Sequence, residues 1–360
     1  MGAPAIPLFD LRMEPEDLAA VEAVLRSGRL RAGEQVEAFE REFAEHIGVR
    51  HAVAVSSCTA ALHLAYLAAG VGPGDEVVVP SITFAASAAA VLYCGGTPVF
   101  ADVRGPHDVG VDPADVERRL TARTKAVCAV HYAGYPAAVD TLRELCDAHG
   151  AVLVEDAAHA PSADLDGRML GAWGQSGCFS FFSNKVLAVG EGGLLTTDDG
   201  DVADRVRELR SGPFNLRLDE PRAALLRSRM ARMANDIARR RELTLRYREL
   251  LRGLDGVVVP YEDGDVEHSS CYVMPLVLER DGLQGPVRTH LRERHGIQTS
   301  LLYPAVHEFT AYRERFGASL PRAEAIARRE ITIPLYGLMT DEQQDRVVAA
   351  LREALAEAGA

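Results

Sequence analysis

The sequence predicts an α/β protein that has a mostly parallel sheet and a smaller α+β C-terminal domain. From about residue 51, short β-rich runs alternate with helical stretches, and the strand runs are apolar along their whole length. This rhythm changes after residue 221. Continuous apolar strands that alternate with helices are typical of a parallel sheet covered on both faces. At 360 residues, the chain can form a large domain and a smaller partner domain.

The elements of the large domain follow one another at short intervals. The apolar runs predict strands at 52–56, 76–80, 98–102, 125–132, 151–156, 177–183 and 193–197. The intervening stretches predict helices through residues 62–67, across 84–94, near 113–120 and at 138–149.

The C-terminal part of the chain has a different pattern. A long helical stretch is expected over roughly 221–252, followed by strands at 257–260 and 271–278 and by helices ending at 341–357. We therefore expect a large domain over 1–235 and a small domain over 236–360, with an N-terminal segment able to pack on the small domain.

Composition excludes several classes of function. A net charge of −13 argues against a nucleic-acid partner, because binding to the phosphate backbone needs a basic surface. No apolar run of about 18 residues predicts a membrane span, and the N-terminus lacks the pattern of a secretory signal. The six cysteines show no CxxC pair, and the eleven histidines show no HExxH motif. We expect a cytoplasmic protein without metal catalysis.

Lysine is unusually rare in this chain. Of 39 basic residues, two are lysines, Lys125 and Lys185, and the other 37 are arginines. Arginine cannot replace a lysine whose neutral amine is needed, because the guanidinium does not lose its proton in practice. Lys125 begins a predicted strand, at the edge opposite the ligand-binding loops, and we interpret it as a solvated surface residue. Lys185 is the candidate for amine chemistry.

Three loops follow strands at their carboxyl ends, where doubly wound sheets bind ligands. The first, at 56–62, carries small residues with hydroxyl groups and opens a helix, which favours a phosphate site. A plain helix N-cap without a ligand is the commoner interpretation of such a segment taken alone.

The second and third loops carry an acid and the candidate lysine. Asp156 ends the strand at 151–156, where it can pair with a protonated ring nitrogen or can cap a helix. Lys185 follows a buried aromatic strand and precedes the glycine-rich run at 190–193. Partial burial lowers the pKa of an amine, and the neutral amine is the nucleophile that forms an imine. The alternative is a lysine that reaches out to solvent.

Taken together, these segments resemble the DegT/StrS-type sugar aminotransferases, a family of fold-type I pyridoxal-phosphate enzymes with an aspartate-aminotransferase-like fold. The resemblance covers about residues 28–351. It rests on the order and spacing of GPGDEV, EDAA and FSFFSNKVLAVGEGG, together with VSSCTAALHLA, FNLR and ITIPLYGLMTDEQ.

The resemblance implies roles for individual residues. Lys185 would hold pyridoxal 5'-phosphate as a Schiff base and then move a proton, and Asp156 would keep the pyridine nitrogen protonated. The remaining positions implied by the resemblance are His159 near the phenolic oxygen, Phe84 stacked on the ring, Cys58, Thr59 and Ser180 around the phosphate, and Asn215 reaching the phosphate of a neighbouring subunit. Cys58 stands where the family usually has glycine. Tyr303 and His307 are candidates for the substrate side.

The resemblance also implies a reaction and an assembly. An amino acid, glutamate or glutamine, would load the cofactor as pyridoxamine 5'-phosphate, and a nucleotide-linked keto-deoxysugar would then take the amine. Such a step belongs to amino-sugar or antibiotic biosynthesis, and the shared site implies a homodimer. The alternatives are amination of a keto-cyclitol, a pyridoxal-phosphate lyase and a non-enzymatic regulatory protein. The lysine at position 185 argues against the related sugar dehydratases, which use histidine there.

Overall fold

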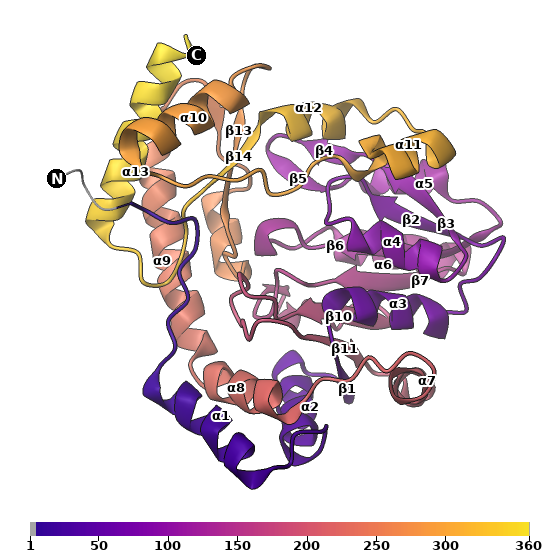
Figure 1. The fold of residues 1–360 in the computed structure, drawn as a ribbon. Coiled ribbons are helices and arrows are strands. Elements are labelled where there is room, and N and C mark those ends of the chain that lie inside the picture. The colour runs from indigo at the N-terminus through magenta and orange to yellow at the C-terminus, as the bar shows by residue number, and fades with distance from the viewer. Residues whose placement is uncertain (1–4, 360) are drawn as a thin grey trace.

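The computed structural model describes residues 5–359 of the chain (Figure 1). Residues 1–4, which begin the segment expected to lack a secretory signal, lie outside the described residues. Residue 360, the last of the predicted small domain, also lies outside them. Among residues 5–359, no helix is both long enough and apolar enough to cross a bilayer.

A seven-stranded sheet forms the centre of the described chain, in the order β1-β11-β10-β7-β6-β2-β3. Strand β11 runs antiparallel to both of its neighbours, and the other pairings are parallel. The mostly parallel α/β sheet predicted from the sequence is thus confirmed. Its strands are β1 (His51–Val55), β2 (Glu76–Pro80), β3 (Thr97–Ala101), β6 (Thr124–Val130), β7 (Val152–Asp156), β10 (Ser176–Ser180) and β11 (Gly193–Thr197).

Helices cover both faces of this sheet, which explains why its strands are apolar throughout. In β1, Val53 and Val55 belong to one hydrophobic core, and Ala52 and Ala54 belong to the other. The first face packs against α3 (Cys58–Ala68), α4 (Ala86–Tyr93) and α7 (Gly200–Ser211). The second face packs against α2 (Glu34–Ile47), α5 (Pro113–Arg119), α6 (Val139–His149) and α8 (Glu220–Met230).

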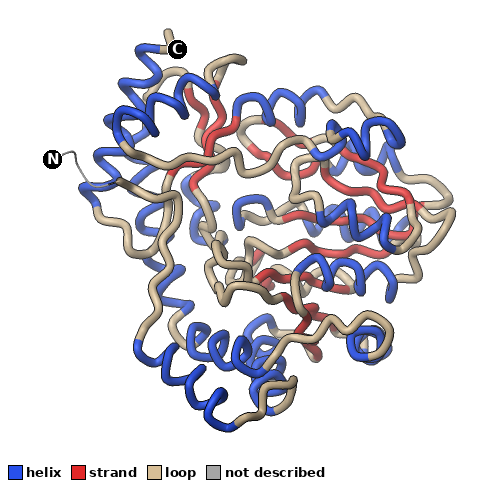
Figure 2. Tube along the Cα trace, in the orientation of Figure 1, coloured by secondary structure: helices blue, strands red, loops and turns tan. Residues whose placement is uncertain are grey.

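A second, three-stranded antiparallel sheet is built from the C-terminal part of the chain, in the order β12-β13-β14. The two sheets lie side by side, and α9 runs along the outer side of the smaller one (Figures 1 and 2). The elements of this part are α9 (Met233–Leu251), β12 (Val257–Val258), η2 (Asp263–His268), β13 (Met274–Leu278), α10 (Gln284–His295), η3 (Val306–Glu308), α11 (Thr310–Phe316), α12 (Pro321–Arg329), β14 (Glu330–Ile333) and α13 (Asp341–Glu357).

The remaining elements are short or lie near the N-terminus. Helix α1 (Pro15–Ser27) packs on α8, and Ile6 forms a parallel bridge with Ile297 of the C-terminal part. The short elements are the hairpin of β4 (Val103–Gly105) and β5 (Asp108–Val111), the hairpin of β8 (Asp164–Leu165) and β9 (Arg168–Met169), and η1 (Tyr132–Gly134).

The long helix expected over 221–252 is wrong, because two helices occupy this stretch. Helix α8 ends at Met230 and α9 begins at Met233. Arg232, at the break, donates hydrogen bonds to the buried Asp17 of α1. This tertiary contact coincides with the break, and the local sequence gives no helix-stop signal there. The predicted domain boundary near residue 235 falls in the first turn of α9 and stays a prediction.

Candidate active site

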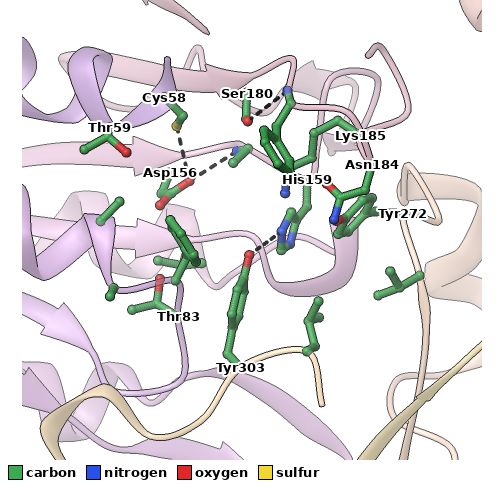
Figure 3. Close-up of a pocket in the computed structure, with 18 of the residues that line it drawn as sticks. Cys58, Thr59, Thr83, Asp156, His159, Ser180, Asn184, Lys185, Tyr272 and Tyr303 are labelled. Atoms are coloured by element: carbon green, nitrogen blue, oxygen red, sulfur yellow. Dashed lines mark hydrogen bonds between the residues drawn. The ribbon is translucent and has the colours of Figure 1, made fainter. Parts of the chain in front are cut away.

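A cavity of about 660 Å³ opens at the carboxyl ends of the central strands (Figure 3). Its walls come from the start of α3, the ends of β7 and β10, the segment that follows β2 and the loop at 300–304 of the C-terminal part. Parallel strands place their carboxyl ends at one edge of a sheet, and loops leaving that edge form the usual ligand crevice of such folds. The cavity therefore lies where the sequence predicted a site.

Asp156 is a buried carboxylate at the end of β7, and 5% of its surface is exposed. Its Oδ2 accepts a hydrogen bond of 2.7 Å from Ser87 Oγ, and its Oδ1 accepts one of 3.2 Å from the Ala158 amide. Cys58 Sγ lies 3.9 Å from Oδ1. Burial raises the pKa of Asp156, although these two bonds and the Lys185 charge act in the opposite direction.

Lys185 lies in the loop between β10 and β11 and is half-buried. Its Nζ stands 4.4 Å from the centre of the Tyr272 ring, at cation–π distance. Burial lowers the pKa of the Lys185 amine to about 8, and the nearby Asp156 charge partly opposes this shift. A substantial fraction of the amine is therefore neutral near physiological pH, as a nucleophile requires.

His159 is a buried, neutral imidazole between two tyrosines. Its ring stacks on Tyr272 with centroids 4.2 Å apart, and its Nε2 lies 2.7 Å from the Tyr303 hydroxyl (Figure 3). Burial, assisted by the positive Lys185, holds the pKa of His159 well below its usual value. Its Nδ1 is buried and has no hydrogen-bond partner among residues 5–359. Burial also raises the pKa of Tyr303, so its phenol keeps its proton.

The start of α3 forms another wall of the cavity. Ser57 caps this helix, because its Oγ accepts a hydrogen bond from the Ala60 amide. Cys58 and Thr59 follow and line the cavity, and the first amides of a helix have no partner within it. A side chain at Gly193 of β11 would place its Cβ 2.2 Å from the Ser57 carbonyl carbon and 2.5 Å from the Cys58 nitrogen. Glycine thus permits this close approach of strand and helix.

Most of the predicted site residues are brought together around this cavity. Its lining includes Cys58, Thr59, Phe84, Asp156, His159, Ser180, Lys185 and Tyr303.

Two predicted residues lie elsewhere. Asn215 is exposed, has a left-handed backbone with φ of 51° and does not line the cavity. His307 is buried behind the wall, where its Nδ1 lies 2.6 Å from Ser81 Oγ and its Nε2 lies 3.5 Å from Glu324. The placement of Asn215 leaves it available to a neighbouring subunit.

The sequence did not identify Ser87, Tyr272 and Arg240 as site residues. Ser87 lies in the SITFAAS segment, whose hydroxyl groups were a usable signal, but its contact with Asp156 spans 69 positions. The buried Arg240 donates hydrogen bonds to the carbonyl oxygens of Cys271, Tyr272 and Leu335, and so fixes the backbone that carries the Tyr272 ring. An arginine within the charged face of a helix gives no such signal.

Known proteins are similar to this chain in sequence and fold over nearly their whole length. The model of the DegT/DnrJ/EryC1/StrS aminotransferase family matches residues 12–352. A transaminase of Streptomyces venezuelae, named for dTDP-3-amino-3,4,6-trideoxy-alpha-D-glucose, is 40% identical over 97% of this chain and 96% of its own length.

Two solved structures show the same likeness. The crystal structure of S. venezuelae DesV with a ketimine intermediate superposes with a TM-score of 0.92 at 40% identity, covering 98% of each chain. 3-Amino-5-hydroxybenzoic acid (AHBA) synthase superposes with a TM-score of 0.88 at 29% identity, again covering 98% of each chain.

Proposed function

The chain belongs to the DegT/DnrJ/EryC1/StrS aminotransferase family, and from this premise we propose that it moves an amino group from an amino acid to the keto group of a nucleotide-linked keto-deoxysugar, with pyridoxal 5'-phosphate as cofactor. One observation carries the proposal. A lysine whose pKa is lowered to about 8 and a buried strand-end carboxylate both line the same cavity.

The residues around the cavity fit pyridoxal 5'-phosphate. Asp156 offers a buried negative charge suited to a protonated ring nitrogen, and Lys185 offers an amine suited to an aldehyde. The start of α3, with Cys58 and Thr59, offers amides and a positive helix end to a phosphate. The buried Nδ1 of His159 has no protein partner among the described residues and is available to a polar group of a ligand.

Each of these residues has a distinct part in the proposed reaction. When bound, the cofactor supplies an electron-accepting ring that stabilises negative charge on the carbon next to the transferred nitrogen. Asp156, when ionised, would hold the proton of the ring nitrogen. Lys185 would hold the cofactor through Nζ, and its neutral amine would then be suited to take up and return a proton as a general base and acid. The neutral His159, which Tyr303 orients, supplies a polar contact without adding a second positive charge beside Lys185.

The substrate class is proposed from the relatives and from the site. The S. venezuelae transaminase is named for a dTDP-linked amino sugar. The 660 Å³ cavity of this chain lies within the volume range usual for small-molecule sites. We propose glutamate or glutamine as the amino donor. All six cysteines are free and buried, which is in keeping with the reducing cytoplasm that we propose as the location.

Covalent trapping tests the cofactor and its lysine. Protein incubated with pyridoxal 5'-phosphate and reduced with borohydride is expected to carry one adduct, on the peptide that contains Lys185. Lys185→Ala should lose the adduct and lower turnover by at least about 100-fold. Its far-UV circular dichroism should not change. The matched control is Lys125→Ala, which removes the other, exposed lysine and should behave as wild type. An adduct that persists in Lys185→Ala would place the nucleophile elsewhere.

A substrate panel tests the amino acceptor. The enzyme is first loaded with glutamate or glutamine, and return of the aldehyde form of the cofactor is followed by absorbance after addition of nucleotide-linked keto sugars, free keto sugars or keto-cyclitols. We expect rapid return with at least one nucleotide-linked sugar. Return with a keto-cyclitol alone, or with no member of the panel, would contradict the proposed substrate class.

We also propose a homodimer with shared active sites. Phe84, Phe182 and Phe214 are each more than 40% exposed, and Phe84 and Phe182 line the cavity mouth. Asn215 follows Phe214, is exposed and does not line the cavity of its own chain. A second subunit would cover these rings and bring its own Asn215 to the cofactor phosphate.

Mixed subunits test the shared site. Asn215→Gly removes the amide while glycine keeps the left-handed backbone. Lys185→Ala and Asn215→Gly proteins, unfolded and refolded together, should form mixed dimers that contain one complete site, so activity should exceed the mean of the two separate variants. Activity equal to that mean would show that each chain completes its own site.

A further inference from the structure

Two histidines and two glutamates form a cluster between α10 and α13, outside the lining of the proposed active-site cavity. His290 and His295 lie on α10, and Glu353 and Glu357 lie one turn apart on α13. The two helices pack side by side at the C-terminal end of the molecule (Figure 1). None of the four residues lines the active-site cavity.

The donor atoms of this cluster are spaced as metal ligands are. His290 Nε2 lies 3.4 Å from one oxygen of Glu353, and His295 Nε2 lies 3.3 Å from the other. Donor atoms of His290, His295 and Glu353 all lie within 4.8 Å of one another. Ligand atoms that surround a tetrahedral Zn²⁺ at about 2.0–2.1 Å are about 3.3 Å apart, and each histidine nitrogen lies at about this distance from a different oxygen of Glu353.

The Nε2 atoms of His290 and His295 form no hydrogen bond with any of the described residues. His290 is 9% exposed, and the Nε2 atoms of His290 and His295 are buried without a hydrogen-bond partner among residues 5–359. Buried ring nitrogens are normally satisfied. The two imidazole rings lie together, with centroids 5.2 Å apart. Both rings thus bring an unsatisfied nitrogen to the Glu353 carboxylate.

A second carboxylate, that of Glu357, lies next to the other ring nitrogen of His290. Glu357 Oε2 lies 3.2 Å from His290 Nδ1, while Glu357 Oε1 accepts a hydrogen bond of 2.9 Å from Arg294. A carboxylate that accepts the Nδ1 proton leaves the Nε2 lone pair free to bind a cation, as in the carboxylate–histidine–zinc arrangement. Glu357 is therefore a positioning residue, and Arg294 fixes its direction.

We propose that this cluster binds one Zn²⁺ ion through His290 Nε2, His295 Nε2 and the Glu353 carboxylate, with water at the fourth position. Two imidazoles and a carboxylate suit Zn²⁺ better than Mg²⁺ or Ca²⁺, which prefer sites made of oxygen ligands. The ion would tie the end of α10 to the last turns of α13. Its role would be structural, because none of its ligands lines the active-site cavity.

Zinc binding to the cofactor-loaded protein tests this proposal. Metal-free protein is dialysed against Zn²⁺ and its metal content is measured, with affinity taken from competition with a chromophoric chelator. We expect one Zn²⁺ per chain. The double variant His290→Gln/His295→Gln should weaken binding by at least about 100-fold, and Glu357→Gln by about 10- to 100-fold. Co²⁺ in place of Zn²⁺ should give the intense visible absorption of a four-coordinate ion, and the double variant should lack it.

His268 provides the control for the zinc experiment. His268 also lies beside two carboxylates, with its Nδ1 3.1 Å from Asp164 and its Nε2 3.6 Å from Glu267, but no second histidine completes a cluster there. His268→Gln should leave the zinc affinity unchanged. If the double variant does not fold, Glu353→Gln replaces it, because this side chain is 47% exposed. No bound Zn²⁺ in the wild type, or equal affinity in wild type and either variant, overturns the proposal, whatever the outcome at Lys185.

Discussion

Burial in the folded chain disfavours the ionised form of Asp156, while its carboxylate accepts two hydrogen bonds, from Ser87 and from the Ala158 amide. Burial raises its pKa above the value of an unfolded aspartate, so the charged form is disfavoured in the cofactor-free protein. A cationic ring nitrogen in the cavity would offset this unfavourable burial. Burial of this charge therefore costs free energy in the cofactor-free protein, and a ligand of opposite charge would reduce that cost. Shifted pKa values of this kind are common in active sites.

Asp156→Asn is expected to separate function from stability. A raised folded-state pKa contributes stability at pH values below the unfolded pKa, and this contribution is lost as pH rises through the folded pKa. At pH 7 the buried charge thus destabilises the cofactor-free fold. The amide of Asn removes that charge and its oxygen still accepts from Ser87, although the bond from the Ala158 amide is lost. Thermal melting should show a cofactor-free variant at least as stable as wild type, with turnover lower by about 100-fold or more. A clear drop in melting temperature would contradict this account.

The pH dependence of Lys185 can be measured against the other lysine of the chain. Because burial lowers the pKa of Lys185 to about 8, its neutral fraction rises between about pH 7 and pH 9. Trace acylation of the cofactor-free protein, analysed by mass spectrometry, should show labelling of Lys185 with a midpoint near pH 8. The exposed Lys125 provides the reference for reagent reactivity in the same sample. A midpoint near pH 10 would show that the amine is not activated by its surroundings.

Among the elements, the junction of β11 with the start of α3 determines the shape of the proposed phosphate site. Strand β11 runs antiparallel between β1 and β10, so Gly193 lies directly under the first turn of α3. The backbone there is too close for any side chain. Glycine is required at this position for packing and not for a special backbone angle.

Gly193→Ala should displace the start of α3. The contacts of the added Cβ are backbone atoms, which cannot rotate away, and overpacking of this kind costs about 1–3 kcal/mol. Urea unfolding should show that loss, and affinity for pyridoxal 5'-phosphate should fall as well. Gly264→Ala is the matched control, because its Cβ meets nothing within 4 Å. Equal cofactor affinity in both variants would argue against a phosphate site at α3.

At the scale of the whole molecule, the fold-type I architecture expected from the resemblance is confirmed by the fold shared with DesV and AHBA synthase. The N-terminal helix packs against α8, and one buried acid lies in this contact. Asp17 is fully buried, accepts hydrogen bonds of 2.7 Å from Ser228 and Arg232, and lies 3.8 Å from Arg229. These bonds join α1 to the junction of α8 and α9.

Asp17→Ala is expected to destabilise the protein by about 3 kcal/mol, because it leaves the buried Arg229 without its charged partner. Urea unfolding followed by circular dichroism measures the change. Glu22→Ala is the control on the same helix. It breaks an exposed pair with Arg26 and should cost less than about 1 kcal/mol. Similar losses in the two variants would show that the buried contact does not anchor α1.

Sequence patterns alone predicted the central sheet and the two residues on which the proposed chemistry depends. Every strand predicted between residues 51 and 197 is present to within a few residues. Apolar runs and their turns are local patterns, and a strand end is a local position, so Asp156 and Lys185 could be picked out by their place along the chain. The resemblance to a family extended this to residues around the cavity, whose roles stay proposals.

Contacts between residues far apart in sequence became visible only in the folded chain. The bond between Tyr303 and His159, the anchor of Asp17 on Arg232 and the cluster of His290 with Glu353 each join different elements. The end of α8 at residue 230 belongs with them, since it coincides with the Asp17 contact. Such pairs leave no local periodicity, because their partners meet only after the two sheets and their helices have packed.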